Sequence, residues 1–134
     1  METLAAAAGS LREKGYRIVL LGGVDEVDDA ATFSKLIGGE VTDLVGRCKL
    51  RETMGVSTHL KLMLGSDTGL MHVAAAMGCP TLTVFGTVPA EKWGHNYPPH
   101  RAIQAPNKDL KLVDPQLLVE AAVDLMASNR SGPT

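Results

Sequence analysis

Aromatic side chains are scarce in this sequence, and no hydrophobic run reaches the length of a transmembrane helix. Phe, Trp and Tyr make up 4% of the 134 residues, so Ala, Val and Leu must fill most of the core. The net charge of −2 provides no basic excess, and we expect no nucleic-acid partner. The length suits one domain with a core of its own.

Cysteine is also rare, since Cys48 and Cys79 stand alone. They form neither a disulfide framework nor a metal-binding spacing, which favours a reducing, cytoplasmic location. No two histidines have the i, i+4 spacing of zinc hydrolases, so we predict no metal site; the histidines are His59, His72, His95 and His100. The first eight residues lack a basic region, and we expect no signal peptide.

Helical and strand-like segments alternate along the chain. Apolar periodicity and glycine stops predict helices at 2–14, 25–37, 50–58, 69–77 and 117–126. Short apolar runs predict strands at 16–21, 41–45, 60–64, 81–85 and 101–104, and residues 89–99 are expected to form an irregular loop. This alternation predicts an α/β fold with a mostly parallel sheet and right-handed crossovers.

The chain is organised around the stretch from Gly65 to Pro80. The predicted strand is followed by Ser66, Asp67 and Thr68, and then by a small, apolar helix that begins at Gly69. The first amides of a helix have no partner within it and carry partial positive charge. Gly69 leaves those amides accessible, Thr68 adds a hydroxyl, and His72 lies one turn further on the same face. This combination suits a phosphate or pyrophosphate.

Two other interpretations of this stretch remain open. The stretch could be a capped, buried helix whose histidine binds a backbone carbonyl, because short motifs also match by chance. Asp67 would then cap the helix, whereas near a ligand it would accept hydrogen bonds from sugar hydroxyls. Asp67 and His72 could also serve a hydrolase, although a helix that starts between them is expected to point them in different directions.

Residues 67–80 read DTGLMHVAAAMGCP and are followed by Phe85-Gly86-Thr87 and Pro89. This pattern resembles the signature of glycosyltransferase family 9, the ADP-heptose:lipopolysaccharide heptosyltransferases and their relatives. The resemblance extends from about Leu11 to Ile103. It implies a three-layer Rossmann-like domain at residues 1–127, the second half of a GT-B enzyme, followed by a polar tail at 128–134.

The resemblance also implies site residues outside the central stretch. Glu26, which follows the Gly22-Gly23 turn, would bind ribose hydroxyls, and the backbone around Arg47 and Cys48 would frame the adenine. From the residues alone, Gly22-Gly23 is a turn with acidic residues after it, and Arg47 is a solvated charge. The expected nucleotide-sugar site therefore comprises Glu26, Arg47, Cys48, Asp67, Thr68, Gly69 and His72.

Parts of the family's architecture are not found in this sequence. The family's acceptor domain, its aspartate base and the first strand of the donor domain have no counterpart here. The resemblance thus implies the donor half of a heptosyltransferase, with an ADP-sugar as substrate, no cofactor and no catalytic residue of its own. We expect the fragment to be inactive and to self-associate through an exposed sheet edge. The full-length enzyme would act on a lipopolysaccharide-type acceptor, in the cytoplasm or peripheral to the inner membrane.

A second hypothesis is a non-catalytic nucleotide-binding module or an enzyme remnant. The third is the hydrolase that uses Asp67 and His72. Nucleotide binding would separate the first two hypotheses from the third, and a transfer assay with a supplied acceptor half would separate the first from the second.

Overall fold

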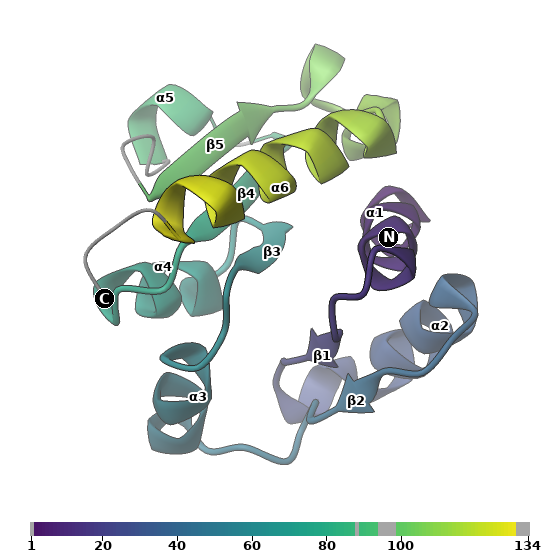
Figure 1. Cartoon of the computed structure of the whole chain (residues 1–134), viewed down its shortest axis with the longest axis vertical. Helices are drawn as coiled ribbons and strands as arrows, with labels where there is room; N and C mark the ends of the chain where they lie inside the picture. The colour runs from purple at the N-terminus through teal and green to yellow at the C-terminus, as the bar shows by residue number, and fades with distance from the viewer. Residues whose placement is uncertain (1, 88, 94–98, 131–134) are drawn as a thin grey trace.

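The structure, a computed structural model, describes residues 2–87, 89–93 and 99–130 (Figure 1). Its α-helices are α1 (Glu2–Glu13), α2 (Val27–Ile37), α3 (Leu50–Ser57), α4 (Gly69–Ala76), α5 (Ala90–Trp93) and α6 (Pro115–Arg130). Short 3₁₀ helices are η1 (Val24–Glu26), η2 (Pro106–Lys108) and η3 (Leu110–Leu112). The strands are β1 (Val19–Leu20), β2 (Thr42–Asp43), β3 (Met63–Ser66), β4 (Thr81–Phe85) and β5 (His100–Gln104). Among these elements, no helix is both long and apolar enough to cross a membrane.

All strand pairs are parallel, which confirms the predicted α/β class, but the strands form two sheets. β1 pairs with β2, while β3, β4 and β5 form a second sheet in that order. Figure 1 shows β1 and β3 as the strands of the two sheets that face each other. The carboxyl ends of parallel neighbours meet at one edge, where the ligands of such folds bind.

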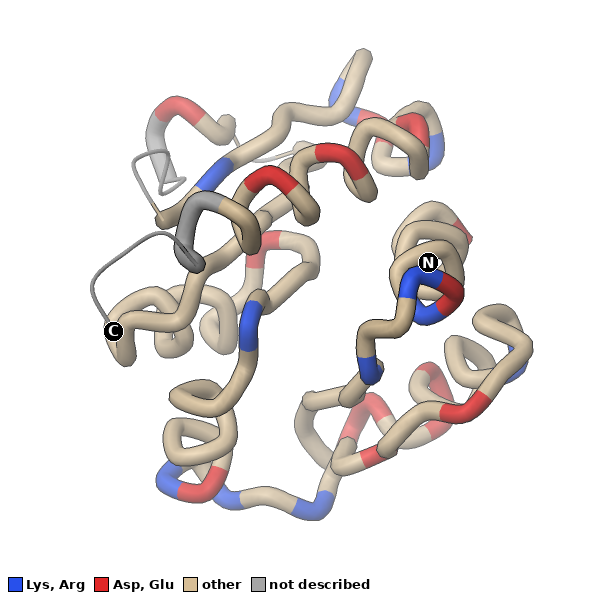
Figure 2. Tube along the Cα trace, in the orientation of Figure 1, with Lys and Arg blue, Asp and Glu red and all other residues tan. Residues whose placement is uncertain are grey.

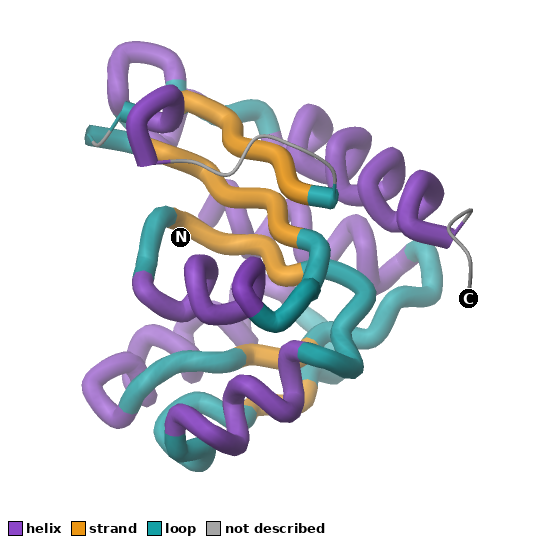
Figure 3. Tube along the Cα trace, turned by 90° about the vertical axis from the view of Figure 1, so that its left-hand side faces the viewer, coloured by secondary structure: helices purple, strands orange, loops and turns teal. Residues whose placement is uncertain are grey.

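Helices cover both faces of the three-stranded sheet, a three-layer arrangement that is visible in Figure 3. α1 packs between α2 and α6, whereas α4 packs on β3 and β4. Every residue of β4 is buried, as expected for the middle strand of a parallel sheet. The larger core cluster joins α1, β4 and α6 through residues such as Ala7, Leu82 and Leu118. A smaller cluster lies between β3 and α4 and contains Met63 and Met71.

Several element boundaries differ from the sequence prediction. β3 begins at Met63 instead of residue 60, because the amide of Leu60 still donates to Ser57 in the turn that ends α3. A short helix, α5, occupies part of the predicted irregular loop, and β5 starts one residue early, at His100. α6 begins at Pro115, the second residue of the Asp114-Pro115 start signal and two residues before the predicted helix, and it continues to Arg130. The first residues of the expected tail are thus helical, and 131–134 lie outside the described residues.

Candidate functional site

The start of α4 lies directly beyond the carboxyl end of β3, as the sequence predicted. β3 ends at Ser66, Thr68 is the N-cap in an extended conformation, and Gly69 is the first helical residue. The side chain of Thr68 makes no capping hydrogen bond, and both Thr68 and Gly69 are exposed. Because the amide of Met71 donates to the carbonyl of Thr68 at 3.1 Å, the first-turn amides left for a ligand are those of Gly69 and Leu70.

The environment of Gly69 supports an open anion site. A Cβ built on Gly69 would meet no protein atom within 4 Å, and its φ is not in the left-handed region. Neither packing nor backbone conformation therefore requires glycine at this position. The side of Gly69 on which a side chain would project is thus open, at a helix start of the kind that binds phosphates.

Asp67 and His72 form a close pair, which corrects the expectation that they point apart. His72 Nε2 lies 3.0 Å from Asp67 Oδ1, and 42% of the His72 side chain and 24% of the Asp67 side chain are exposed. Asp67 lies one residue before the N-cap. Its carboxylate reaches along the first turn to His72 and does not cap the helix. The expectation of Asp67 as the N-cap is also wrong, since Thr68 holds that position. The contact engages one carboxylate oxygen of Asp67 beside the first turn of α4.

Glu26 lies at the carboxyl end of β1, in the turn that precedes α2. Its Oε1 accepts a hydrogen bond from the Gly23 amide at 3.1 Å, so the exposed carboxylate folds back over the Gly22-Gly23 turn. One carboxylate oxygen can hold the turn while the other faces solvent. This arrangement leaves Glu26 able to accept a hydrogen bond from a hydroxyl group of a ligand.

The turn after β1 contacts the turn after β2. The Gly46 amide donates to the carbonyl of Gly22 at 2.9 Å. Gly46 has φ +74°, and a Cβ there would lie 2.9 Å from Val27 Cγ2 and 3.4 Å from the Val24 backbone. Only glycine permits both this conformation and this close approach. The two turns consequently form one continuous surface at the carboxyl edge of the β1–β2 sheet.

Arg47 and Cys48 continue this surface toward α3. Arg47 is exposed, and its amide closes a turn by donating to the carbonyl of Leu44 at 3.0 Å. Cys48 is half-buried. Together with Lys49 and Arg51, Arg47 makes the segment between β2 and the start of α3 locally basic, and Glu52 follows it directly (Figure 2). A basic segment beside the Gly22–Gly46 contact favours an anionic ligand.

Cys79 and His100 are core residues. Burial raises the pKa of the Cys79 thiol from 9.0 to about 11, while a hydrogen bond with the Met63 backbone acts in the opposite direction. His100 is buried, with Nδ1 2.9 Å from Thr81 Oγ1. Across residues 2–87, 89–93 and 99–130, no three His, Cys, Asp or Glu side chains form a group that could hold a metal ion. His95 lies outside the described residues.

Gln104 is a residue that sequence reasoning missed. It ends β5, and its Nε2 donates to the carbonyls of Phe85 at 3.1 Å and Gly86 at 2.8 Å. Its Oε1 accepts from the Ala90 amide at 2.8 Å. The side chain thereby fixes the segment that follows β4, which includes the Phe85-Gly86-Thr87 motif. The only signal in the sequence was a polar residue at the carboxyl end of a predicted strand.

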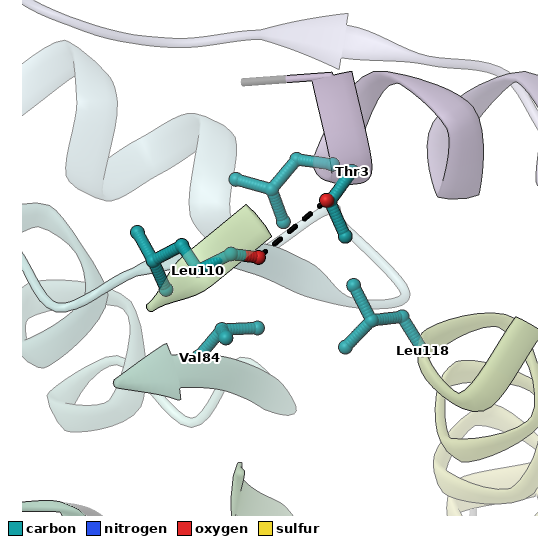
Figure 4. A pocket seen from close by; sticks show the side chains of 5 residues that line it. Thr3, Val84, Leu110 and Leu118 are labelled. Atoms are coloured by element: carbon teal, nitrogen blue, oxygen red, sulfur yellow. Dashed lines mark hydrogen bonds between the residues drawn. The ribbon is translucent and has the colours of Figure 1, made fainter. Parts of the chain in front are cut away.

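A small apolar cavity lies where α1 meets β4 and η3 (Figure 4). It has a volume of about 20 Å³ and is lined by Thr3, Leu4, Val84, Leu110 and Leu118. Thr3 Oγ1 donates to the carbonyl of Leu110 at 3.5 Å. This space holds at most one water molecule, so it is not a nucleotide site.

Comparison with solved structures places the fold among glycosyltransferases. A family 9 glycosyltransferase from Veillonella parvula superposes with a TM-score of 0.84 over 95% of this chain and 41% of its own, at 16% identity. E. coli ADP-heptose lps heptosyltransferase II superposes with a TM-score of 0.82 over 96% of this chain and 41% of its own, at 21% identity. The chain therefore has the fold of one part of a GT-B heptosyltransferase.

The sequence model of glycosyltransferase family 9 (heptosyltransferase) matches residues 1–118, and the chain belongs to this family. Lipopolysaccharide heptosyltransferase 3 of Escherichia coli is 31% identical over 66% of this chain and 27% of its own length. Lipopolysaccharide heptosyltransferase 2 of Salmonella typhimurium is 28% identical over 61% of this chain and 25% of its own. The alignments thus span about a quarter of the length of these relatives.

Proposed function

We propose that this chain is the donor-binding part of a family 9 glycosyltransferase and that it binds the diphosphate of a nucleotide-sugar at the start of α4. The observation that carries the proposal is the exposed first turn of α4, where a Cβ on Gly69 would meet no protein atom within 4 Å. Thr68 supplies a hydroxyl donor, and His72 supplies an imidazole on the same face. These groups bind the diphosphate and stabilise it as it leaves the sugar.

The nucleoside is assigned to the surface formed by the two neighbouring turns. The free carboxylate oxygen of Glu26 accepts from the ribose hydroxyls, and the backbone at Arg47 and Cys48 contacts the base. Asp67 orients His72 and accepts from a hydroxyl of the donor. ADP is the proposed nucleotide, and it is supported by two family neighbours at 24% identity, E. coli heptosyltransferase WaaC with ADP and with ADP-2-deoxy-2-fluoro heptose.

The complete enzyme would transfer a heptose, or a related sugar, to a lipopolysaccharide-type acceptor. This assignment is supported by the family and by the names of the relatives. We assign neither a cofactor nor a general base to this chain. The acceptor and the base belong to the remainder of the enzyme, which would work in the cytoplasm or at the inner membrane.

Calorimetric titration with ADP tests the proposed site. We expect the unmodified chain to bind with a Kd on the order of 0.1–1 mM. The substitution Gly69→Val should weaken binding at least about tenfold, because the branched side chain occupies the space of the phosphate.

Gly55→Val is the matched control, since Gly55 is exposed in α3 and a Cβ there also meets no atom within 4 Å. This variant should bind ADP like the unmodified chain. Normal binding by Gly69→Val would contradict the phosphate assignment, and so would unfolding of Gly69→Val alone, because the glycine would then serve the fold.

The Asp67–His72 contact of 3.0 Å supports one alternative, a hydrolase in which Asp67 orients His72 as a general base. Such an enzyme would turn over a hydrolysable substrate without any acceptor, and His72→Gln would abolish that turnover. Binding of ADP without ADP hydrolysis would instead favour the donor-binding function or a non-catalytic nucleotide-binding module.

A further inference from the structure

The segment that follows β4 is held by Gln104, the last residue of β5. Its Nε2 donates to the carbonyls of Phe85 at 3.1 Å and Gly86 at 2.8 Å. The Ala105 amide donates to the same Phe85 carbonyl at 2.7 Å. Both carbonyls therefore face Gln104, and the Phe85 carbonyl also faces the chain that continues β5. The proposed nucleotide site gives this segment no role, although it lies at the carboxyl end of β4.

The two carbonyls determine the direction of the next two amides. In a trans peptide, the usual form, the N–H group points opposite to the carbonyl of the preceding residue. The Gly86 amide therefore points away from β5, and the Thr87 amide points away from Gln104. Within residues 2–87, 89–93 and 99–130, neither amide donates a hydrogen bond to another group. Gly86 is half-buried and Thr87 is exposed, which leaves two neighbouring donors for water or a ligand.

Strand register places these amides beside the start of α4. Ser66, the last residue of β3, is the partner of Val84, two residues before Gly86. Thr68, the N-cap of α4, comes two residues after Ser66, so it lies at about the same level of the sheet edge as Gly86. β3 and β5 lie on opposite sides of β4. The Gly86 amide, which points away from β5, is consequently directed toward the start of α4.

Gly86 is also fixed from the side of the 3₁₀ helices. A Cβ on Gly86 would lie 3.3 Å from Leu110 Cγ and 3.5 Å from the Lys108 carbonyl oxygen, so this residue packs closely against η2 and η3. This packing and the Gln104 hydrogen bonds hold the two peptide groups in one orientation. Donors that are fixed before binding lose little conformational entropy when a ligand arrives.

The strand order gives the sequence in which an extended ligand meets these groups. The nucleoside is assigned to the turns after β1 and β2, whereas α4 follows β3 and the Gly86 and Thr87 amides follow β4. β3 pairs with β4 and faces β1 (Figure 1). Along the edge, the start of α4 therefore lies between the nucleoside surface and these amides. A phosphate at α4 is then proximal to the nucleoside, and the amides after β4 lie on the distal side.

We propose that the Gly86 and Thr87 amides bind the distal phosphate of the diphosphate, the one that carries the sugar, and that Gln104 is the residue that positions them. This inference rests on the proposed function, which assigns the diphosphate to the start of α4. Successive backbone amides that face one side form a concave anion site. When the bond to the sugar breaks, its electron pair stays on an oxygen of the distal phosphate, and the two amides stabilise that charge.

NMR titrations of the ¹⁵N-labelled chain with ADP and with AMP test the proposal, because AMP lacks the distal phosphate. Both nucleotides should shift the Gly69 and Leu70 amide signals, whereas only ADP should shift those of Gly86 and Thr87. Equal shifts of Gly86 and Thr87 with both nucleotides, or no shift with ADP, would overturn the proposal. Gly69 and Leu70 signals that move with neither nucleotide would instead contradict the proposed function.

Two substitutions test the amides and Gln104 through the ratio of ADP affinity to AMP affinity, measured by calorimetry. Thr87→Pro removes one amide, and its reference is Thr87→Ala, which keeps the amide and likewise lacks the hydroxyl. Gln104→Leu releases both carbonyls, and Gln116→Leu, on the exposed start of α6, is its control. We expect the ratio to fall at least about fivefold in Thr87→Pro and in Gln104→Leu relative to these references.

An unchanged ratio in Thr87→Pro would show that this amide binds no phosphate, and an unchanged ratio in Gln104→Leu would show that Gln104 does not position the donors. Either result would overturn that part of the proposal. A general loss of folded protein lowers ADP and AMP binding together and leaves their ratio unchanged, so it does not imitate the expected result. If Thr87→Pro does not fold, the ratio in Gln104→Leu and the two titrations decide.

Discussion

Three glycines around α4 illustrate how one residue type serves different purposes. A Cβ on Gly65 would lie 3.2 Å from Met71 Sδ, so this glycine allows α4 to pack closely on β3. Gly78 has φ +84° and ends the helix in the left-handed region, as its position predicted. Gly69 has neither constraint. The glycine with no structural reason is the one placed where a phosphate needs access, which supports a functional reason for it.

Part of the candidate site could be predicted from residue types alone, because Gly69 and the helix start follow from local rules. The Asp67–His72 pair could not be predicted, because it depends on the backbone conformation at Asp67, one residue before the N-cap. Gln104 was missed for a similar reason: its three hydrogen bonds join segments that are far apart in the sequence. Side-chain contacts across turns and strands require the backbone path, which the sequence does not specify by itself.

The buried thiol of Cys79 predicts a pH dependence of stability. Because burial raises its pKa from 9.0 to about 11, the thiol ionises more readily in the unfolded chain. The folded state is therefore fully favoured below pH 9 and loses stability as the pH rises toward 11. Relative to Cys79→Ala, we expect a decrease of about 2 to 3 kcal/mol in the free energy of unfolding across this range. Denaturant titrations at pH 8 and 11 measure it.

Cys48 is present in both proteins and cancels in this comparison. Equal pH dependence of the unmodified chain and Cys79→Ala would contradict the burial argument.

At the level of elements, the sequence predicted the type and order of most helices and strands. The main errors are the lengths of strands in the two-stranded sheet. Residues 16–21 form an almost continuous apolar run, but only Val19–Leu20 form β1. This strand has a ladder on one side only, and its partner β2 is equally short. An apolar run indicates that a segment is suited to a buried position. The length of the strand that it forms depends on the neighbouring strands with which it can pair.

The loop after β4 should depend on Gln104. The substitution Gln104→Leu removes its two bonds to carbonyls and its bond from the Ala90 amide. Because Gln104 is exposed, we expect a loss of only about 1–2 kcal/mol in the free energy of unfolding, with faster hydrogen exchange at Ala90. Gln116→Leu, on the exposed start of α6, is the matched control. A similar effect of both substitutions would show that Gln104 does not fix the loop.

At the scale of the whole molecule, the chain contains a parallel α/β unit in which an edge of β1 and an edge of β3 lie toward each other without a hydrogen-bond ladder between them. The relatives share this fold over 36–41% of their own chains. Reactions that join two substrates gain much of their rate from holding both in a fixed geometry. A part that binds only the donor should consequently bind without turnover.

We therefore predict that the chain alone transfers no sugar. The purified chain is incubated with ADP-heptose and a lipopolysaccharide core acceptor, and release of ADP is followed over time. We expect a rate equal to that of a sample without protein. Turnover well above that rate would show that this chain contains a base, and it would direct attention to Asp67 and His72.

NMR titration of the ¹⁵N-labelled chain with ADP and, separately, with adenosine shows whether the first turn of α4 binds the diphosphate. We expect ADP to shift the Thr68, Gly69 and Leu70 amide signals and adenosine to leave them in place, because adenosine lacks the phosphates that these amides bind. Adenosine should still shift signals near Gly23 and Arg47, where the nucleoside is assigned. Equal shifts of the three α4 signals with both ligands, or no shift with ADP, would contradict a diphosphate site at this helix start.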